Sequence, residues 1–283
     1  MKHELLLCCH NRFDIVPEGF IPIQCGAALN PPIVGTIKDN IGVNISSKNS
    51  AYCELTAHYY AWKNTDADYY GFCHYRRFFS IDDKTKKAYI VRGRISKNDL
   101  PMFGNLNNLE QIFQNYDIIA TKSEDMGLTV REHYYTSKHH YSEDLDLFIQ
   151  ILEEQFPEYT TTVELYLSQN KQYFCNMFIM KKADFHEYCS VLFNALEEFD
   201  KCKKLHGDFQ SDRTDGYLGE IFTGIFITHK RKLGSKIKEL PRIDAECSAK
   251  KRMLYHLLPP ESKARFIAKQ LIKSLKRKYE TKT

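Results

Sequence analysis

Apolar runs and amphipathic stretches alternate along most of the chain. The continuous apolar run ELLLCC at 4–9 is typical of a buried, parallel strand. Apolar and aromatic residues recur every three to four positions over 51–64, which predicts a helix packed on a sheet. A run rich in Tyr, Phe and Cys predicts a second strand at 69–75. The chain is therefore expected to begin with a strand–helix–strand unit of an α/β fold.

The same alternation continues further along the chain. The patterns predict strands over 116–121 and 173–182, and helices over 108–115, 160–170 and 183–202, from Ser142 up to Pro157, and from 216 onward. Ser142 is the expected N-cap of its helix. Two segments, 17–50 and 80–105, have little periodicity and are expected to be irregular loops, of the kind that often line binding sites.

The last part of the chain has a different character. From Pro259 onward, one helical face is apolar and the other is rich in Lys and Arg. Such a basic amphipathic helix can lie on an anionic membrane surface, and the alternative is a final helix docked on the domain. We therefore expect one domain over 1–240, followed by a helical basic tail over 241–283.

Composition narrows the class of protein. The 43% hydrophobic content of the 283 residues indicates a folded protein with a substantial core. The first apolar run is too short for a signal peptide, and no later run reaches the roughly 18 apolar residues of a membrane span. Nine cysteines without CxxC pairs predict free thiols in a reducing cytoplasm and no structural zinc. The net charge of +4, with basic residues apart from the aromatic ones, argues against a nucleic-acid partner.

The stretch DADYYGFCHYRRFF at 66–79 is the most informative motif. It places His74, Arg76 and Arg77 at the carboxyl end of a predicted strand. Open α/β sheets bind ligands beyond the carboxyl ends of their strands, and guanidinium groups donate bidentate hydrogen bonds to phosphate. The alternative is that these arginines pair with surface carboxylates.

Several other chemistries are excluded or less favoured. The sequence contains no P-loop, no GxGxxG after a strand, no HExxH and no GxSxG. The acidic pair Asp66 and Asp68 precedes its strand, whereas a transferase that holds a divalent ion needs such a pair after a strand. His139 and His140, followed by two carboxylates, are a weaker metal candidate. Cationic side chains can offset diphosphate charge in place of a metal.

Further polar residues interrupt apolar segments or fill the first loop. His10 ends the first strand and can stack on a nucleotide or cap a loop. Asn176 lies within an apolar run, so it is either a structural hydrogen-bonding hub or a ligand contact. The first loop carries polar side chains that can line a site: Asp39, Asn40, Asn44, Ser46, Lys48 and Asn49.

Several of these segments together resemble one bacterial family. They are DNIGVNISSKNSAYCELTAHYYAWKN, DYYGFCHYRRFF, HHYSEDLD, NMFIMKK and RTDGYLGE, in this order. The chain is similar, from about residue 3 to about 230, to the capsular and exopolysaccharide glycosyltransferase family catalogued as domain of unknown function 4422. The resemblance implies a GT-A-like fold, with a mixed, mostly parallel sheet flanked by helices. It also implies a nucleotide-sugar transferase, with galactofuranosyl transfer among the activities attributed to members.

The resemblance also implies roles for individual residues. His74, Arg76 and Arg77 are expected to bind the donor diphosphate, and the nucleoside is assigned to His10, Asn44, Lys48 and Asn49. Three carboxylates compete as the base that takes the acceptor proton: Asp144, Asp215 and Glu220. The sugar or acceptor is assigned to His139, His140, Asn176, Arg213 and Tyr217. No metal or other cofactor is expected, because the acidic pair of many GT-A enzymes is missing, and Mn²⁺ or Mg²⁺ is the alternative.

The expected function is transfer of a sugar from a UDP-sugar to a growing surface polysaccharide or lipid-linked oligosaccharide, with inversion. The expected location is the cytoplasm, at the inner face of the cell membrane, with the basic tail on anionic lipid. Two alternatives belong to other classes: a non-catalytic nucleotide- or saccharide-binding module, and a membrane-surface scaffold of a polysaccharide assembly complex. Hydrolysis of a UDP-sugar without acceptor would separate catalysis from both alternatives.

Overall fold

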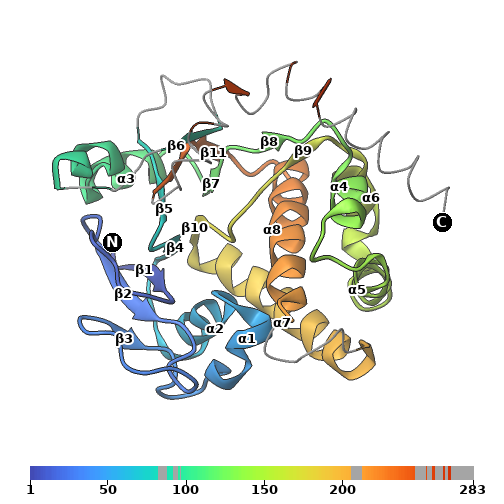
Figure 1. The fold of residues 1–283 in the computed structure, drawn as a ribbon, viewed down its shortest axis with the longest axis horizontal. Helices are drawn as coiled ribbons and strands as arrows, with labels where there is room; N and C mark the ends of the chain where they lie inside the picture. Colours follow the sequence, from blue (N-terminus) through green and yellow to red (C-terminus); the bar gives the residue numbers. More distant parts are fainter. Residues whose placement is uncertain are drawn as a thin grey trace.

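The computed structural model describes residues 1–81, 88–91, 95, 97–204, 212–245 and the isolated positions 253, 257, 258, 264, 267 and 268. Its main feature is a mixed, mostly parallel sheet (Figure 1). The strand order is β11-β7-β10-β4-β1-β2-β3. The strands are β1 (His3–Cys9), β2 (Phe20–Gln24), β3 (Ile37–Lys38), β4 (Tyr69–His74), β7 (Ile118–Thr121), β10 (Phe178–Lys181) and β11 (Ile237–Leu240).

Strand direction determines where the functional end of the sheet lies. Strands β4, β1, β2 and β3 run parallel, so their carboxyl ends share one edge. Strand β10 runs antiparallel between β4 and β7. A small extension is formed by β5 (Arg77–Phe79), β6 (Tyr89–Val91) and β12 (Arg242–Asp244), and β8 (Glu124–Asp125) pairs with β9 (Lys171–Gln172). This sheet confirms the expected α/β fold.

Helices cover the sheet on both faces. They are α1 (Asn49–Tyr52), α2 (Leu55–Asn64), α3 (Leu106–Phe113), α4 (Val130–Thr136), α5 (Ser142–Gln155), α6 (Thr160–Ser168), α7 (Lys182–Cys202) and α8 (Thr214–Lys232), with 3₁₀ turns at Ser46–Lys48, Lys97–Phe103 and Pro157–Tyr159. In Figure 1, α2, α7 and α8 lie together beside the strands, and α3 lies apart from them.

The core consists of two apolar clusters, which follow from the alternation of side chains along each strand. In β1, Leu6 and Cys8 face the cluster that packs on α2, α5, α7 and α8, whereas Leu5 and Leu7 face the cluster that contains residues of α3. Because successive side chains of a strand point to opposite faces, a strand covered on both faces must be apolar at every position. This explains the continuous run ELLLCC.

Several predicted boundaries were wrong. The single helix expected over 51–64 is two helices, because Cys53 has φ 51° and ψ −129° and reverses the chain between them. The segment 17–50 contains β2 and β3, two parallel strands that its Pro and Gly content concealed. The strand expected over 173–182 starts only at Phe178, after two residues with positive φ. Ser142 begins α5 but is not its N-cap, which is Tyr141.

The expected tail cannot be compared with the structure. Most of 241–283, and most of the 80–96 part of the expected flap, lie outside the described residues. Within the described part of the tail segment, β12 extends the sheet to Asp244, past the expected boundary at residue 240. None of the helices described is both long enough and apolar enough to span a membrane.

Candidate active site

Two histidines meet at the carboxyl ends of β1 and β4. Cys8 and His74 are partners in the parallel pairing, and His10 follows directly after β1. The ring centroids of His10 and His74 are 5.9 Å apart. The backbone N–H of Arg76 donates to Nδ1 of His74 at 3.3 Å, which fixes the orientation of that ring. The sheet therefore brings together two residues that lie 64 positions apart in the sequence, at the edge where a ligand was expected.

Arginines surround these histidines. Arg76 is exposed, with its guanidinium 4.9 Å from the centre of the Tyr75 ring. Arg77 is partly buried, and its Nε lies 3.6 Å from Oδ1 of Asp244, so it also has the carboxylate partner that the alternative interpretation expected. Arg213 is exposed and lies over the Tyr217 ring at 5.6 Å, and its charge acts on both histidines.

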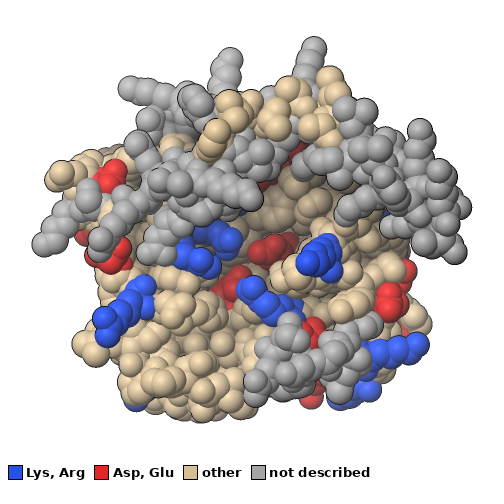
Figure 2. Space-filling model, in the orientation of Figure 1, with Lys and Arg blue, Asp and Glu red and all other residues tan. Residues whose placement is uncertain are grey.

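The positive charge of this site lowers the pKa values of the two histidines. Burial lowers the pKa of His74 well below its usual value, and the charges of Arg77, Arg76 and Arg213 lower it further. Burial also lowers the pKa of His10. Both rings are therefore expected to be neutral at pH 7, and the positive charge is carried by the arginines. On the face shown in Figure 2, Lys and Arg side chains gather around Asp and Glu side chains in a hollow near its centre.

Glu54 lies at the turn between α1 and α2. This turn packs closely on α8. A Cβ atom at Gly216 would lie 3.0 Å from Sγ of Cys53, and one at Gly219 would lie 2.7 Å from Cδ1 of Leu55. Only glycine permits this approach of the turn to the helix. The approach brings the buried side chain of Glu54 to the first turns of α8, where Glu220 lies.

A two-residue turn before β10 binds both carboxylates. Cys175 and Asn176 have φ of 79° and 47°, in the left-handed region that non-glycine residues seldom occupy. The backbone N–H of Cys175 donates to Oε1 of Glu220 at 2.9 Å. The Nδ2 of Asn176 donates to Oε1 of Glu54 at 3.0 Å and to the carbonyl of Gly216 at 3.2 Å. Strained residues of this kind often cluster at functional sites.

Among the three predicted bases, Glu220 combines partial burial with a raised pKa. Burial raises its pKa to about 7, and the nearby negative charge of Glu54 contributes to the rise. Arg77, the Cys175 N–H and Arg242 act in the opposite direction. A carboxylate that titrates near neutral pH can take up a proton during a reaction.

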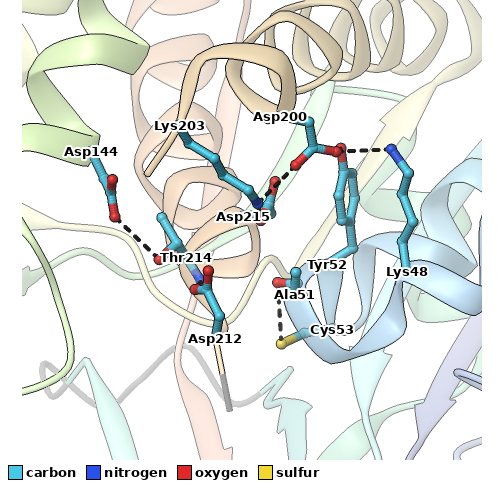
Figure 3. A network of polar contacts seen from close by, with 10 residues as sticks. All are labelled: Lys48, Ala51, Tyr52, Cys53, Asp144, Asp200, Lys203, Asp212, Thr214 and Asp215. Atoms are coloured by element: carbon cyan, nitrogen blue, oxygen red, sulfur yellow. Dashed lines mark hydrogen bonds and ion pairs between the residues drawn. The ribbon is translucent and has the colours of Figure 1, made fainter. Parts of the chain in front are cut away.

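Asp215, the second predicted base, belongs to a buried ion network (Figure 3). It is fully buried, and Nζ of Lys203 lies 2.7 Å from its Oδ2. Lys203 also pairs with Asp200 at 2.7 Å, and Asp200 in turn binds Lys48 and the hydroxyl of Tyr52, each at 2.8 Å. This network joins the end of α7 to the start of α8, next to Arg213.

The third predicted base, Asp144, is also buried. The hydroxyl of Thr214 donates to its Oδ2 at 3.3 Å (Figure 3). Nearby, the His140 ring packs between Tyr134 and Tyr217, with each centroid 4.3 Å away, and burial lowers the pKa of His140 to about 4. Its neighbour His139 is exposed.

The residues predicted in the first loop make local contacts. Asn49 donates to the carbonyl of Cys53 at 2.6 Å, and Asn44 donates to the carbonyl of Gly42 at 2.8 Å. Lys48 pairs with Asp200 as described above. Asp39 is fully buried and accepts from the N–H groups of Gly26 and Ala27. None of these contacts tests the nucleoside-binding role, which stays a prediction.

Glu54 is not among the site residues that the sequence predicted. The signal that could have revealed it is a carboxylate within the otherwise apolar AYCELTA, together with the glycines of DGYLGE on its partner helix. Within the described residues, no group of three or more His, Cys, Asp or Glu side chains is arranged to hold a metal ion.

Comparison with known proteins identifies the family. The model of the family described as a domain of unknown function, DUF4422, matches residues 4–231. The chain belongs to this family. Among solved structures, the apo form of the bifunctional glycosyltransferase WbbM is similar to this DUF4422 protein, with a TM-score of 0.80 and 28% identity over 87% of the chain. No curated protein matches it.

The similarity to WbbM supports the expected GT-A-like fold. The DUF4422 chain spans 46% of the WbbM chain, so it corresponds to less than half of that protein.

Proposed function

We propose that this DUF4422 protein transfers a sugar from a UDP-sugar to a hydroxyl group of a saccharide acceptor. The observation that carries the proposal is the arrangement at the carboxyl ends of β1 and β4. There, His10 and His74 lie among Arg76, Arg77 and Arg213, and Arg77 also acts on Glu220, a carboxylate whose pKa is raised to about 7. The similarity to a glycosyltransferase supports the same conclusion.

In this proposal the donor diphosphate binds the arginines. Arg76 is the main ligand, because it is exposed and its guanidinium is held against Tyr75. Arg77 adds positive charge, although Asp244 neutralises part of it. Arg213 is the third cationic side chain of the site. Preorganised cations at the leaving group stabilise the charge that develops there, which is the role of a metal ion in other transferases.

Glu220 is the proposed base. The pKa values of Asp215 and Glu220 are both raised to about 7, but Asp215 is fully buried and paired with Lys203, and Asp144 is also buried, whereas Glu220 is only partly buried. The acceptor hydroxyl oxygen forms a bond to the anomeric carbon as the bond from that carbon to the diphosphate oxygen breaks. The hydroxyl proton passes to Glu220, and UDP leaves with the bonding electron pair. This single displacement inverts the anomeric centre.

The wider setting is part of the proposal. The acceptor is a growing surface polysaccharide or a lipid-linked oligosaccharide, and galactofuranose is a candidate sugar, as the family resemblance implies. The proposed location is the cytoplasmic face of the membrane, with the basic tail on anionic lipid. Asn176, Tyr217 and the His139–His140 pair are proposed to line the acceptor side.

Release of UDP from a panel of UDP-sugars, with and without added saccharide, tests this proposal. The wild type should release UDP, and Glu220→Gln should lower the rate about 10²–10⁴-fold, because a general base contributes about that much. Glu198→Gln is the matched control, since Glu198 is half-buried on α7 and pairs with Lys201 of the same helix. Wild-type protein that consumes no UDP-sugar, or Glu220→Gln with full activity, would contradict the proposal.

A further inference from the structure

The two glutamates at the site are held by one short turn. Cys175 donates its backbone N–H to Glu220, and the next residue, Asn176, donates its side-chain amide to Glu54. The two carboxylates come from different elements, the α1–α2 turn and helix α8. Their positions are therefore fixed relative to each other by two consecutive residues with positive φ.

The orientation of the Asn176 amide follows from its neighbours. The carbonyl of Gly216 can only accept a hydrogen bond, so the Nδ2 of Asn176 must face it, and Glu54 lies on the same side. On the other side, the hydroxyl of Thr223 donates to Oδ1 of Asn176 at 3.2 Å, and the hydroxyl of Tyr188 lies 2.9 Å from that of Thr223. Glu54 thus faces an N–H donor of the Asn176 amide.

The charged neighbours of the two glutamates differ. Glu54 interacts with His10 at the end of β1 and with Arg213 before α8, and these interactions raise the pKa values of both groups. Glu220 interacts with titratable and charged groups on several elements: Glu54 and Cys53 on the turn, Arg77 on β5, Arg242 on β12, Cys175 before β10, Tyr166 on α6, Tyr188 on α7 and Tyr217 on its own helix α8. Of these groups, Glu54 is the one that raises the pKa of Glu220, because two nearby negative charges repel each other.

We propose that Glu54 is a positioning residue: held in place by Asn176, it keeps Glu220 ready to accept the proton of the acceptor hydroxyl. Glu54 does not itself take the proton. It acts through its negative charge on Glu220. This inference rests on the proposed function for the identity of the substrate, but the coupling of the two glutamates does not depend on turnover.

The test is a titration of Glu220 in the full chain labelled with ¹³C-glutamate at the side-chain carboxyl. The carboxyl resonance of Glu220 is identified because it is missing in Glu220→Gln. This resonance is followed by NMR from pH 4 to pH 9. In Glu54→Gln, the midpoint of Glu220 should fall by about one pH unit or more, because a like charge has been removed. The Gln side chain still offers an oxygen to Nδ2 of Asn176, so the fold is expected to persist.

Two further variants make the result specific. Glu54→Asp keeps the negative charge, so its Glu220 midpoint should stay close to that of the wild type. Glu187→Gln, which removes a carboxylate on α7 that pairs with Lys230, should leave the midpoint unchanged. A Glu220 midpoint that is the same in Glu54→Gln as in wild type would overturn the inference.

Comparison with UDP release separates this inference from the proposed function. A midpoint that moves in a protein that consumes no UDP-sugar would support the glutamate pair and contradict the proposed function. Turnover by a protein whose midpoint does not move would do the opposite. If both hold, the acidic limb of the pH–rate profile should move in Glu54→Gln by the same amount as the NMR midpoint, and a limb that stays in place would overturn the positioning role.

Discussion

The Nε of Arg213 donates a hydrogen bond to the Sγ of Cys53, 3.2 Å away. This contact joins the residue before α8 to the turn between α1 and α2. Burial raises the pKa of Cys53 to about 12, so the sulfur is a thiol and accepts through a lone pair. The strained backbone of Cys53 therefore places its sulfur atom where the sulfur accepts a hydrogen bond from Arg213 and orients this arginine.

Cys53→Ala is expected to weaken donor binding without affecting the chemical step. The loss of one hydrogen bond to a charged donor, worth about 1 kcal/mol, should raise the KM for a UDP-sugar roughly fivefold with kcat unchanged. Steady-state kinetics measure this. Cys202→Ala is the control, because Cys202 is an exposed free thiol. A KM equal to that of wild type would show that Cys53 does not position Arg213.

Two variants of Asn176 separate two contributions to the free energy of unfolding: the strain of its positive φ and the hydrogen bonds of its side-chain amide. Glycine and alanine both remove the amide and leave Glu54 without this donor, so each variant should lose about 1–3 kcal/mol of unfolding free energy. Alanine must also adopt a φ near 47°, so Asn176→Ala should be less stable than Asn176→Gly by about 1 kcal/mol. Urea denaturation of both variants measures the difference. Equal stabilities would mean that the backbone relaxes and stores no strain.

The ion network in Figure 3 makes a prediction about stability. Lys203→Met leaves the fully buried Asp215 without its cation, and breaking a buried pair in this way typically costs about 3–5 kcal/mol. The double variant Lys203→Met/Asp215→Asn should recover much of this loss, because no uncompensated charge remains. Lys201→Met is the control, since Lys201 is exposed and should change stability by less than about 0.5 kcal/mol. A single variant as stable as this control would contradict the assignment of a buried pair.

The raised pKa of Glu220 predicts a dependence of stability on pH. Its ordinary value is 4.5 and its value in the folded protein is about 7, so the folded state holds this proton more tightly. The contribution is fully present below pH 4.5 and is lost as the pH rises through 7. Between pH 4.5 and pH 8, wild type should therefore lose about 2–3 kcal/mol relative to Glu220→Gln. Other groups, including Asp215, titrate in both proteins and cancel in the comparison.

Urea denaturation of wild type and Glu220→Gln at pH 4.5, 6 and 8 measures this difference. A difference that stays constant across the three values would contradict the pKa shift of Glu220.

The sequence was sufficient for features that depend on local pattern. The apolar run at 4–9 and the aromatic run at 69–75 predicted the two central strands, because strands covered on both faces leave a continuous apolar signal. The position of His74 and the arginines beyond a strand end followed directly. In contrast, β2 and β3 were missed, because they are short strands within a segment rich in Pro and Gly. They are recognised only by the pairing of β2 with β1 and of β3 with β2.

The carboxylates could not be ranked from the sequence, because their chemistry depends on distant residues. Asp215 and Glu220 lie five positions apart on the same helix, yet one faces Lys203 and the other faces Glu54 and Arg77. The role of Glu54 depends on the close packing of its turn on Gly216 and Gly219, and on the turn at Cys175 and Asn176. These contacts span more than 120 positions of the chain between Glu54 and Asn176.

Calorimetric titration of UDP into wild type, Arg76→Ala and Arg131→Ala, each with EDTA and with manganese, tests whether arginine binds the diphosphate without a metal ion. Arg131 is the matched control, because it pairs with Glu164 and Asp146 on helices away from the site. We expect binding in EDTA for wild type and Arg131→Ala, and at least tenfold weaker binding for Arg76→Ala, since a charge-assisted hydrogen-bond pair is lost. Binding that requires manganese, or that is equally strong in all three proteins, would contradict an arginine-based diphosphate site.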